Sequence, residues 1–170
     1  YRADLVEAAG IGVSTIKTWD DVARVMKPLV QDTDGDGVID RYPLSMWPTH
    51  VDHVELLLLQ GGGGFFDAQG RLVIDRPVNA AILARIVMWC LGETRIADNA
   101  MNFTLGGNQM KADGSVVCSF FPDWMGDVWK GEIPTLAGKM KLMPLPAWGD
   151  VVREYAGDAA AERRTSVWGG

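Results

Sequence analysis

Apolar residues recur three or four positions apart in several stretches of the chain, which is the spacing of an amphipathic helix. The clearest stretch follows Thr18, whose hydroxyl stands three residues before the Asp21 carboxylate, as in a helix-capping motif. Pro28 should bend or shorten this helix near its end. A second clear helix should begin at Pro77 and end at Gly92. Weaker patterns predict further helices over residues 1–9, 51–60, 105–112 and 123–130.

Short apolar runs between turn residues predict β-strands elsewhere in the chain. These runs are Tyr42–Met46, Ser115–Phe121 and Lys139–Leu145, with a hairpin expected over residues 65–74. Helices interleaved with short strands predict an α/β fold, in which a short mixed sheet is flanked by helices. The 170 residues fit a single domain of this kind, over residues 1–170. Residues 149–164 are polar and rich in alanine, and we expect them to form a surface excursion or a linker.

The composition argues against several classes of protein. Apolar residues make up 48% and charged residues 22% of the chain, so it should fold as an ordinary globular domain. No apolar run approaches the roughly 20 residues of a membrane-spanning helix, so membrane insertion is not expected. The net charge of -6, without a basic cluster, disfavours nucleic acid and anionic membranes as partners. Both ends look cut, and we expect a piece of a longer protein.

The sequence gives little support to nucleophilic or zinc-dependent catalysis. The chain has no Gly-x-Ser-x-Gly motif, and the glycine run at 61–64 lacks the Lys-Ser/Thr of a phosphate-binding loop. His50 and His53 are the only histidines, and no third metal ligand accompanies them. Cys90 and Cys118 lie in apolar surroundings and are either two buried thiols or one disulfide bridge.

An acidic loop spans residues 32–40 and places oxygen donors at alternate positions. The donors are the carboxylates of Asp32, Asp34, Asp36 and Asp40, with the carbonyl of Val38 between the last two. Gly37 permits the sharp turn that wraps such a loop around a hard cation. Pro43 stands where the bidentate glutamate of a high-affinity calcium loop would be, so affinity should be weak. We expect a structural calcium site here, with a solvated turn that binds no ion as the alternative.

Tryptophan is unusually frequent, at seven residues, and several of the indoles stand beside polar groups. Trp124 follows a predicted buried strand directly and is preceded by Pro122 and Asp123. An indole face can stack on a pyranose while a neighbouring carboxylate accepts hydrogen bonds from sugar hydroxyls. A second polar and aromatic loop contains Trp47, His50, Asp52 and His53, and Trp168 precedes Gly169. Trp19 and Trp89 keep helical register and are assigned to the core, and Trp129 to packing.

The order of these motifs resembles that of a known family. The motifs are Tyr1-Arg-Ala-Asp-Leu, Thr18-Trp-Asp-Asp21, the acidic loop with Arg41-Tyr42, Gly61–Gly64, Phe121-Pro-Asp-Trp124, Gly138–Pro146 and Trp168-Gly-Gly170. The chain resembles the extracellular sugar-binding proteins of ABC importers, solute-binding family 1, which includes maltose- and arabinose-type receptors. The resemblance covers nearly the whole chain. It implies one lobe, the C-terminal one, of a periplasmic-binding-protein-like type II fold.

The resemblance also implies a function and a set of site residues. The protein would be a non-catalytic receptor, periplasmic or extracellular, that holds a mono- or oligosaccharide between two lobes and presents it to the ABC permease. The missing N-terminal lobe would complete the site. Trp124 matches the stacking aromatic, with Asp123 beside it, and Trp168 and Gly169 match a contact on the hinge side. The loop with Trp47, His50, Asp52 and His53 matches a second ligand-facing segment, and residues 151–162 look inserted.

Two other functions remain open from the residues alone. In a carbohydrate-active hydrolase, Asp123 would work with a second acid such as Asp52. In a calcium-dependent structural or adhesion module, the loop at 32–40 would be the functional feature. Release of reducing sugar would favour the hydrolase, whereas folding that needs calcium, without any response to sugar, would favour the module.

Overall fold

A small parallel sheet lies at the centre of the fold. The computed structural model describes residues 1–46 and 51–167. Its sheet contains β1 (Tyr42–Ser45), β2 (Ala97–Asp98) and β3 (Val116–Cys118) in the order β2-β1-β3. Both pairings with β1 are parallel, with Leu44 opposite Ala97 on one side and Cys118 on the other. The expected α/β fold with a short sheet is confirmed, and its described strands all run parallel.

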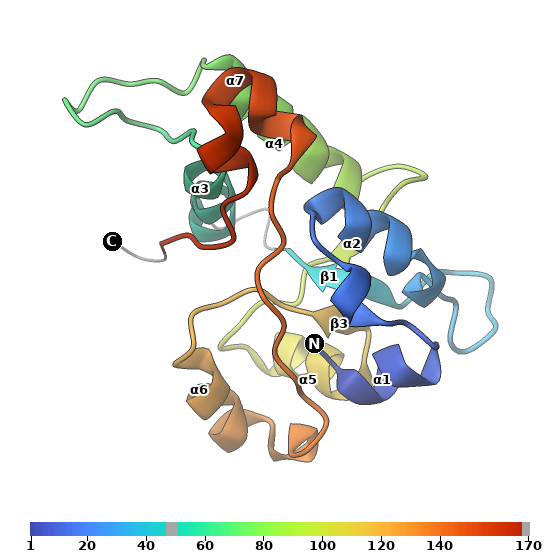
Figure 1. Ribbon diagram of the computed structural model, residues 1–170. Helices are drawn as coiled ribbons and strands as arrows, with labels where there is room; N and C mark the ends of the chain where they lie inside the picture. The colour runs from blue at the N-terminus through green and yellow to red at the C-terminus, as the bar shows by residue number, and fades with distance from the viewer. Residues whose placement is uncertain (47–50, 168–170) are drawn as a thin grey trace.

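Helices surround this sheet, and all but α2 gather in two groups (Figure 1). They are α1 (Ala3–Ala8), α2 (Trp19–Val25), α3 (Val51–Gln60), α4 (Pro77–Cys90), α5 (Leu105–Asp113), α6 (Met125–Glu132) and α7 (Asp150–Ala161). One group, α3, α4 and α7, packs together beyond one end of the sheet, whereas α1, α5 and α6 lie at the other. In the described ranges, no helix is both long enough and apolar enough to span a membrane.

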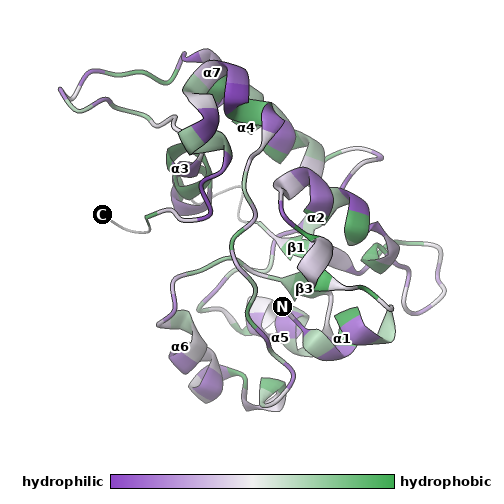
Figure 2. Cartoon of the chain, viewed as in Figure 1, coloured by the Kyte–Doolittle hydropathy of each residue, from purple (hydrophilic) through white to green (hydrophobic). Residues whose placement is uncertain are grey.

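An aromatic cluster forms the centre of the core. The Trp19 ring lies 5.4 Å from the rings of Trp89 and Phe120, and Trp89 stacks on Trp148 at 5.6 Å. All four side chains are buried, so the assignment of Trp19 and Trp89 to the core is confirmed. The cluster joins α2, α4, the end of β3 and the segment that leads into α7. In Figure 2, hydrophobic colour accordingly follows the strands and much of α4.

The predicted helices agree with the structure at most of their boundaries. The Thr18 hydroxyl accepts a hydrogen bond from the Asp21 N–H, and the Asp21 carboxylate accepts one from the Thr18 N–H, which confirms the capping motif. Pro28 shortens the helix as expected, because α2 gives way to a 3-10 turn over Lys27–Leu29. The prediction for α3 coincides with the observed bounds, and α4 begins at Pro77 as predicted but ends at Cys90, two residues before Gly92.

Three segments differ from the predictions. The sequence predicts no strand at β2, because two residues are too few to produce a pattern. Lys139–Leu145 forms no regular strand, and its one β-bridge joins Met140 to Arg2. Residues 149–164 are not a linker, because α7 buries Val152, Ala160 and Ala161 in the core. The apparent insertion within that segment stays a prediction.

The two cysteines are free thiols and do not form the disulfide bridge that was the other alternative. Cys118 is buried at the end of β3, where burial raises the pKa of its thiol to about 11. Cys90 is half-buried at the end of α4, and burial raises its pKa as well. Both thiols therefore stay protonated at neutral pH and are poor nucleophiles.

Candidate functional site

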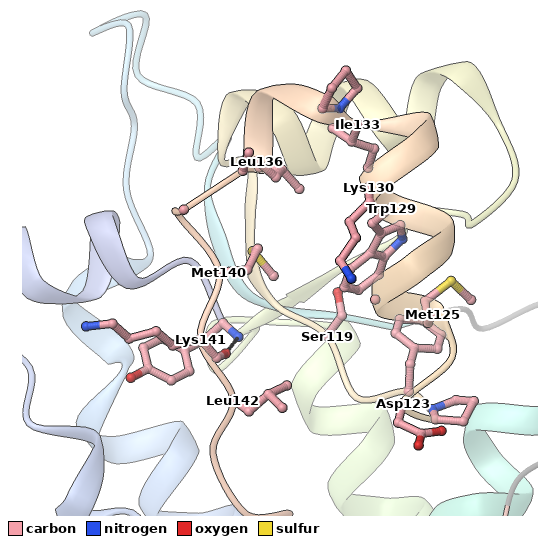
Figure 3. Close-up of a pocket in the computed structure, with 17 residues that line it drawn as sticks. Ser119, Asp123, Met125, Trp129, Lys130, Ile133, Leu136, Met140, Lys141 and Leu142 are labelled. Atoms are coloured by element: carbon pink, nitrogen blue, oxygen red, sulfur yellow. Dashed lines mark hydrogen bonds between the residues drawn. The ribbon is translucent and has the colours of Figure 1, made fainter.

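An apolar cavity of about 650 Å³ opens beside the carboxyl end of β3 (Figure 3). Its walls are α6, the 3-10 turn Pro134–Leu136, the segment 138–142 and the loop 119–123. Met125 and Trp129 on α6, and Ile133 directly after it, stand four residues apart, so one face of the helix points into the cavity. Met140 faces them from the opposite wall.

Asp123 lines this cavity where the loop after β3 enters α6, and Trp124 is the next residue along the chain. The Asp123 side chain lines the cavity and is exposed, and its Oδ1 accepts a hydrogen bond from the Trp124 N–H at 2.9 Å. Trp124 is the residue before the first turn of α6, and 48% of its surface is exposed. The indole is therefore not sealed in the core, and the cavity is lined by its two sequence neighbours, Asp123 and Met125, but not by Trp124 itself. Stacking of a sugar on this indole stays a prediction.

His53, one of the two histidines expected to face a ligand, lies in the core instead. His53 has no exposed surface, and its ring lies 4.7 Å from the ring of Phe120 and 5.0 Å from that of Phe121. The expectation was wrong, because the first turn of α3 directs this side chain towards the aromatic end of β3. Asp52, one residue earlier, is partly exposed.

Four other expected site residues lie outside the described residues. They are Trp47, His50, Trp168 and Gly169. Their assignment to the sugar site therefore stays a prediction, as does that of Asp52 and Asp123.

The acidic loop brings three carboxylates together. Oxygens of Asp32, Asp34 and Asp40 all lie within 4.8 Å of one another, whereas Asp36 is not part of this group. Asp32 accepts hydrogen bonds from the N–H groups of Gly37 (2.8 Å) and Gly35 (2.6 Å), and these bonds lower the pKa of its carboxyl. The three side chains form an oxygen donor set of the kind that calcium prefers.

The sequence patterns missed much of the cavity wall. Phe121 and Trp129 meet edge to face, with ring centroids 5.7 Å apart, and Trp129 was expected only to pack. The four-residue spacing of Met125, Trp129 and Ile133 was visible in the sequence, but it predicts an apolar helix face without saying what that face meets. The opposing Met140 belongs to a segment whose position depends on the tertiary fold.

This chain is similar to known proteins in sequence and in fold. No family model matches it. The arabinooligosaccharide-binding protein of Halalkalibacterium halodurans is 29% identical over 157 residues, and the protein of the same name from Bacillus subtilis is 25% identical over 156 residues. Each match covers 87% of this chain but only 32% and 33% of the relatives. The chain thus spans about a third of the length of the curated relatives it matches.

Solved structures of solute-binding proteins are similar to this chain in fold. An ABC transporter solute-binding protein from Thermotoga lettingae, bound to alpha-D-tagatose, matches 86% of this chain with a TM-score of 0.65 and 18% identity. The maltose/maltodextrin-binding domain MalE from Bdellovibrio bacteriovorus, bound to maltotriose, matches 87% with a TM-score of 0.62 and 15% identity. This chain covers 38% and 36% of those two chains. It therefore has the fold of part of an ABC solute-binding protein of the MalE type.

Proposed function

We propose that this chain binds carbohydrate as one lobe of a non-catalytic receptor that serves an ABC importer. The observation that carries the proposal is the match to two proteins named for binding arabinooligosaccharides, which extends over 87% of this chain. The ligand class is a mono- or oligosaccharide, and arabinooligosaccharides are the first candidates to test. Such a receptor would work in the periplasm or outside the cell, with the permease as its partner.

The recognition surface would be formed by Trp124 and Asp123 at the start of α6. A half-exposed indole offers one face to the C–H groups of a sugar ring, and the exposed carboxylate next to it accepts hydrogen bonds from hydroxyls. Asp123 shares the lining of an apolar cavity with Trp129, and this apolar wall would limit the water that competes for the hydrogen bonds of the carboxylate. Sugar binding needs this combination of a flat apolar surface and a nearby acceptor.

Transport would depend on two lobes that close around the sugar. A ligand shifts a conformational equilibrium only as far as it binds one state better than the other. A sugar that touches both lobes makes all of its contacts only in the closed state, and it thereby stabilises the form that a permease would recognise. One lobe alone makes part of these contacts and should bind weakly, because fewer contacts offset the entropy lost on association.

The acidic loop would have a separate and structural role. We propose that Asp32, Asp34 and Asp40 hold a calcium ion, which would relieve the repulsion among three carboxylates that lie within 4.8 Å of one another. Asp36 and the Val38 carbonyl would complete the ligand set predicted from the spacing. The loop connects the 3-10 turn after α2 to β1, so the ion would stiffen this connection.

A hydrolase is the alternative from another class. The curated relatives are named as binding proteins, which favours a receptor. A hydrolase that used Asp123 would release reducing sugar from arabinooligosaccharides, and Asp123→Asn would abolish this release. Under the receptor proposal, the sugar is recovered intact after prolonged incubation.

The sugar proposal is tested by titrating the chain with arabinotriose and following the indole N–H resonances by NMR. We expect the Trp124 resonance to shift, and Trp124→Ala to lower the affinity by roughly 1–3 kcal/mol, as for an aromatic anchor. Tyr155→Ala is the matched control, because Tyr155 is also 48% exposed but lies on α7 at the other end of the molecule (Figure 1). Equal affinities of the wild type and the Trp124→Ala variant would refute the role of the indole.

A further inference from the structure

The exposed face of α4 carries apolar side chains along its whole length. A helix at a protein surface usually turns charged or polar residues towards the solvent. On α4 the exposed residues share one face and are all apolar: Pro77, Ala80, Ala84, Val87 and Met88, with Leu91 continuing the row directly after the helix. Arg85, the one charged residue of α4, lies outside this row and pairs with Asp20 of α2. We call the five residues from Ala80 to Leu91 the α4 stripe, and exposed apolar surface of this kind marks contact with another molecule.

The side chains of the α4 stripe change in size along the helix. The first half of the stripe contains two alanines, Ala80 and Ala84, whereas the second half contains Val87, Met88 and Leu91, which are 55%, 44% and 65% exposed. If two such helices pack antiparallel about a two-fold axis, the small half of each helix faces the large half of the other. The large side chains then fill the space over the alanines. The stripe is therefore complementary to a second copy of itself.

A hollow of about 580 Å³ opens at the first turn of α4, between this helix and α7. Arg76, the residue before α4, lines the hollow and stands four positions before Ala80, so it lies on the same face as the stripe. Arg163, beyond the end of α7, lines the hollow as well, and Glu154 is the one carboxylate among its walls. The first turn of a helix also carries a partial positive charge. This end of the stripe therefore favours a carboxylate.

The other end of the α4 stripe offers a carboxylate. The chain turns sharply after α4 at Gly92, whose φ is 73°, and Glu93 follows as an exposed residue. Arg76 and Glu93 stand eight and nine residues from Ala84, on opposite sides of it along the chain. A two-fold axis near Ala84 therefore brings the Glu93 of each copy to the Arg76 of the other. Charge complementarity and side-chain size thus favour the same antiparallel arrangement.

We propose that two copies of this chain pair through the α4 stripe, with their α4 helices antiparallel. The large side chains of each stripe cover the alanines of the other, and each Glu93 carboxylate lies beside Arg76 of the other copy. Trp124 and Asp123 precede α6, which belongs to the other group of helices, so the dimer leaves the proposed sugar surface open (Figure 1). This inference goes beyond the proposed function, because it does not depend on any sugar.

The test measures self-association of the 170-residue chain by sedimentation velocity. The α4 stripe has fewer residues than the roughly 20–30 per side of a standard interface, so the dimer should be weak and should form between about 0.05 and 1 mM. Val87→Glu places a charge in the middle of the stripe and should weaken association at least about tenfold. Glutamate favours a helix more than valine does, so the fold should be kept. Leu105→Glu is the matched control, because Leu105 is 92% exposed on α5, and it should leave association within about twofold of the wild type.

An exchange of charges tests the direction of the pairing. Arg76→Glu and Glu93→Arg each replace an attraction by a repulsion at both symmetric contacts. In about 50 mM salt, where screening is weak, we expect each single variant to weaken association about fivefold. The double variant restores the attraction with the charges reversed, so its association should return to within about twofold of the wild type.

Three results would overturn the proposal. A wild-type chain that stays monomeric at about 1 mM would show that the α4 stripe does not bind a second copy. Equal association of the wild type and the Val87→Glu variant would show that the copies meet through another surface. A double charge variant that associates no more tightly than the single variants would exclude the antiparallel pairing of Arg76 with Glu93.

Discussion

The side chain of Gln60 connects three parts of the chain that are distant in sequence. This residue ends α3 and is fully buried. Its Oε1 accepts a hydrogen bond from the Trp19 indole N–H at 2.9 Å, and its Nε2 donates to the carbonyls of Pro146 (2.6 Å) and Arg163 (2.9 Å). One amide therefore joins α2 to the two segments that lead into and out of α7. We predict that Gln60→Leu destabilises the fold.

The size of the effect follows from what the substitution leaves behind. Leucine has a similar volume, so no large cavity forms, but the Trp19 N–H and the Pro146 carbonyl lose their partners inside the core. Each unsatisfied buried group costs about 1–3 kcal/mol. The Arg163 carbonyl is only partly buried, so water can replace the amide there. We expect a loss of about 3 kcal/mol in the free energy of unfolding, or a fall of roughly 6–12 °C in Tm for a domain of this size.

The assay is urea unfolding of the 170-residue chain, followed by tryptophan fluorescence. The buried cluster of Trp19, Trp89 and Trp148 reports the same region directly. Gln69→Leu is the matched control, because Gln69 is exposed in a turn and should change the free energy of unfolding by less than about 0.5 kcal/mol. If the free energy of unfolding of the Gln60→Leu variant were also within about 0.5 kcal/mol of the wild-type value, the hydrogen bonds of Gln60 would not hold these segments together.

Three further predictions follow from other sites. Calcium should raise the Tm of the wild type, and Asp34→Ala should abolish this rise. If a chelator does not change the Tm of the wild type, the proposal of a calcium site is refuted. Burial lowers the pKa of Lys111 to about 8, so the folded chain binds fewer protons than the unfolded chain between about pH 8 and pH 10.5, and the free energy of unfolding rises with pH in this range. Relative to Lys111→Met, the wild type should gain about 2 kcal/mol in the free energy of unfolding between pH 7 and pH 10, measured with urea. The absence of this gain would contradict the burial of the Lys111 amine. Gly63→Ala should destabilise the fold by more than about 2 kcal/mol, because the new Cβ would overlap the Asn79 Oδ1 that accepts a hydrogen bond from the Gly64 N–H. Gly106→Ala is the control: its Cβ meets open space in α5, and it should stabilise the fold by up to about 1 kcal/mol. Equal effects of the two substitutions on Tm would refute the packing argument.

Local patterns predicted the parts of the fold that depend on neighbours in sequence. The capping pair of Thr18 and Asp21 and the helix-starting Pro77 fixed where two helices begin, because these interactions span only a few residues. The strand over Lys139–Leu145 was predicted from the same kind of pattern and did not form as such. A strand needs a partner along its length, and local sequence does not supply one.

The candidate site was only partly predictable for a related reason. Asp123 and Trp124 stand together in the sequence, and the structure leaves both exposed, with Asp123 lining a cavity. His53 looked similar in the sequence, as a polar residue next to Asp52, yet it lies in the core against Phe120. Which way a helix turns its first residues depends on what packs against it, and that is a property of the whole fold.

By itself, the sequence determined the α/β class, most helix boundaries, the buried indoles of Trp19 and Trp89 and the family that the motif order resembles. These features depend on spacing and residue type, which are local or are preserved in order along the chain. Only the tertiary structure decided that residues 150–161 pack on α4, that His53 is buried and that Met140 faces Trp129 across a cavity. Contacts of this kind join segments far apart in the chain, and they form only where the packing of the core brings those segments together.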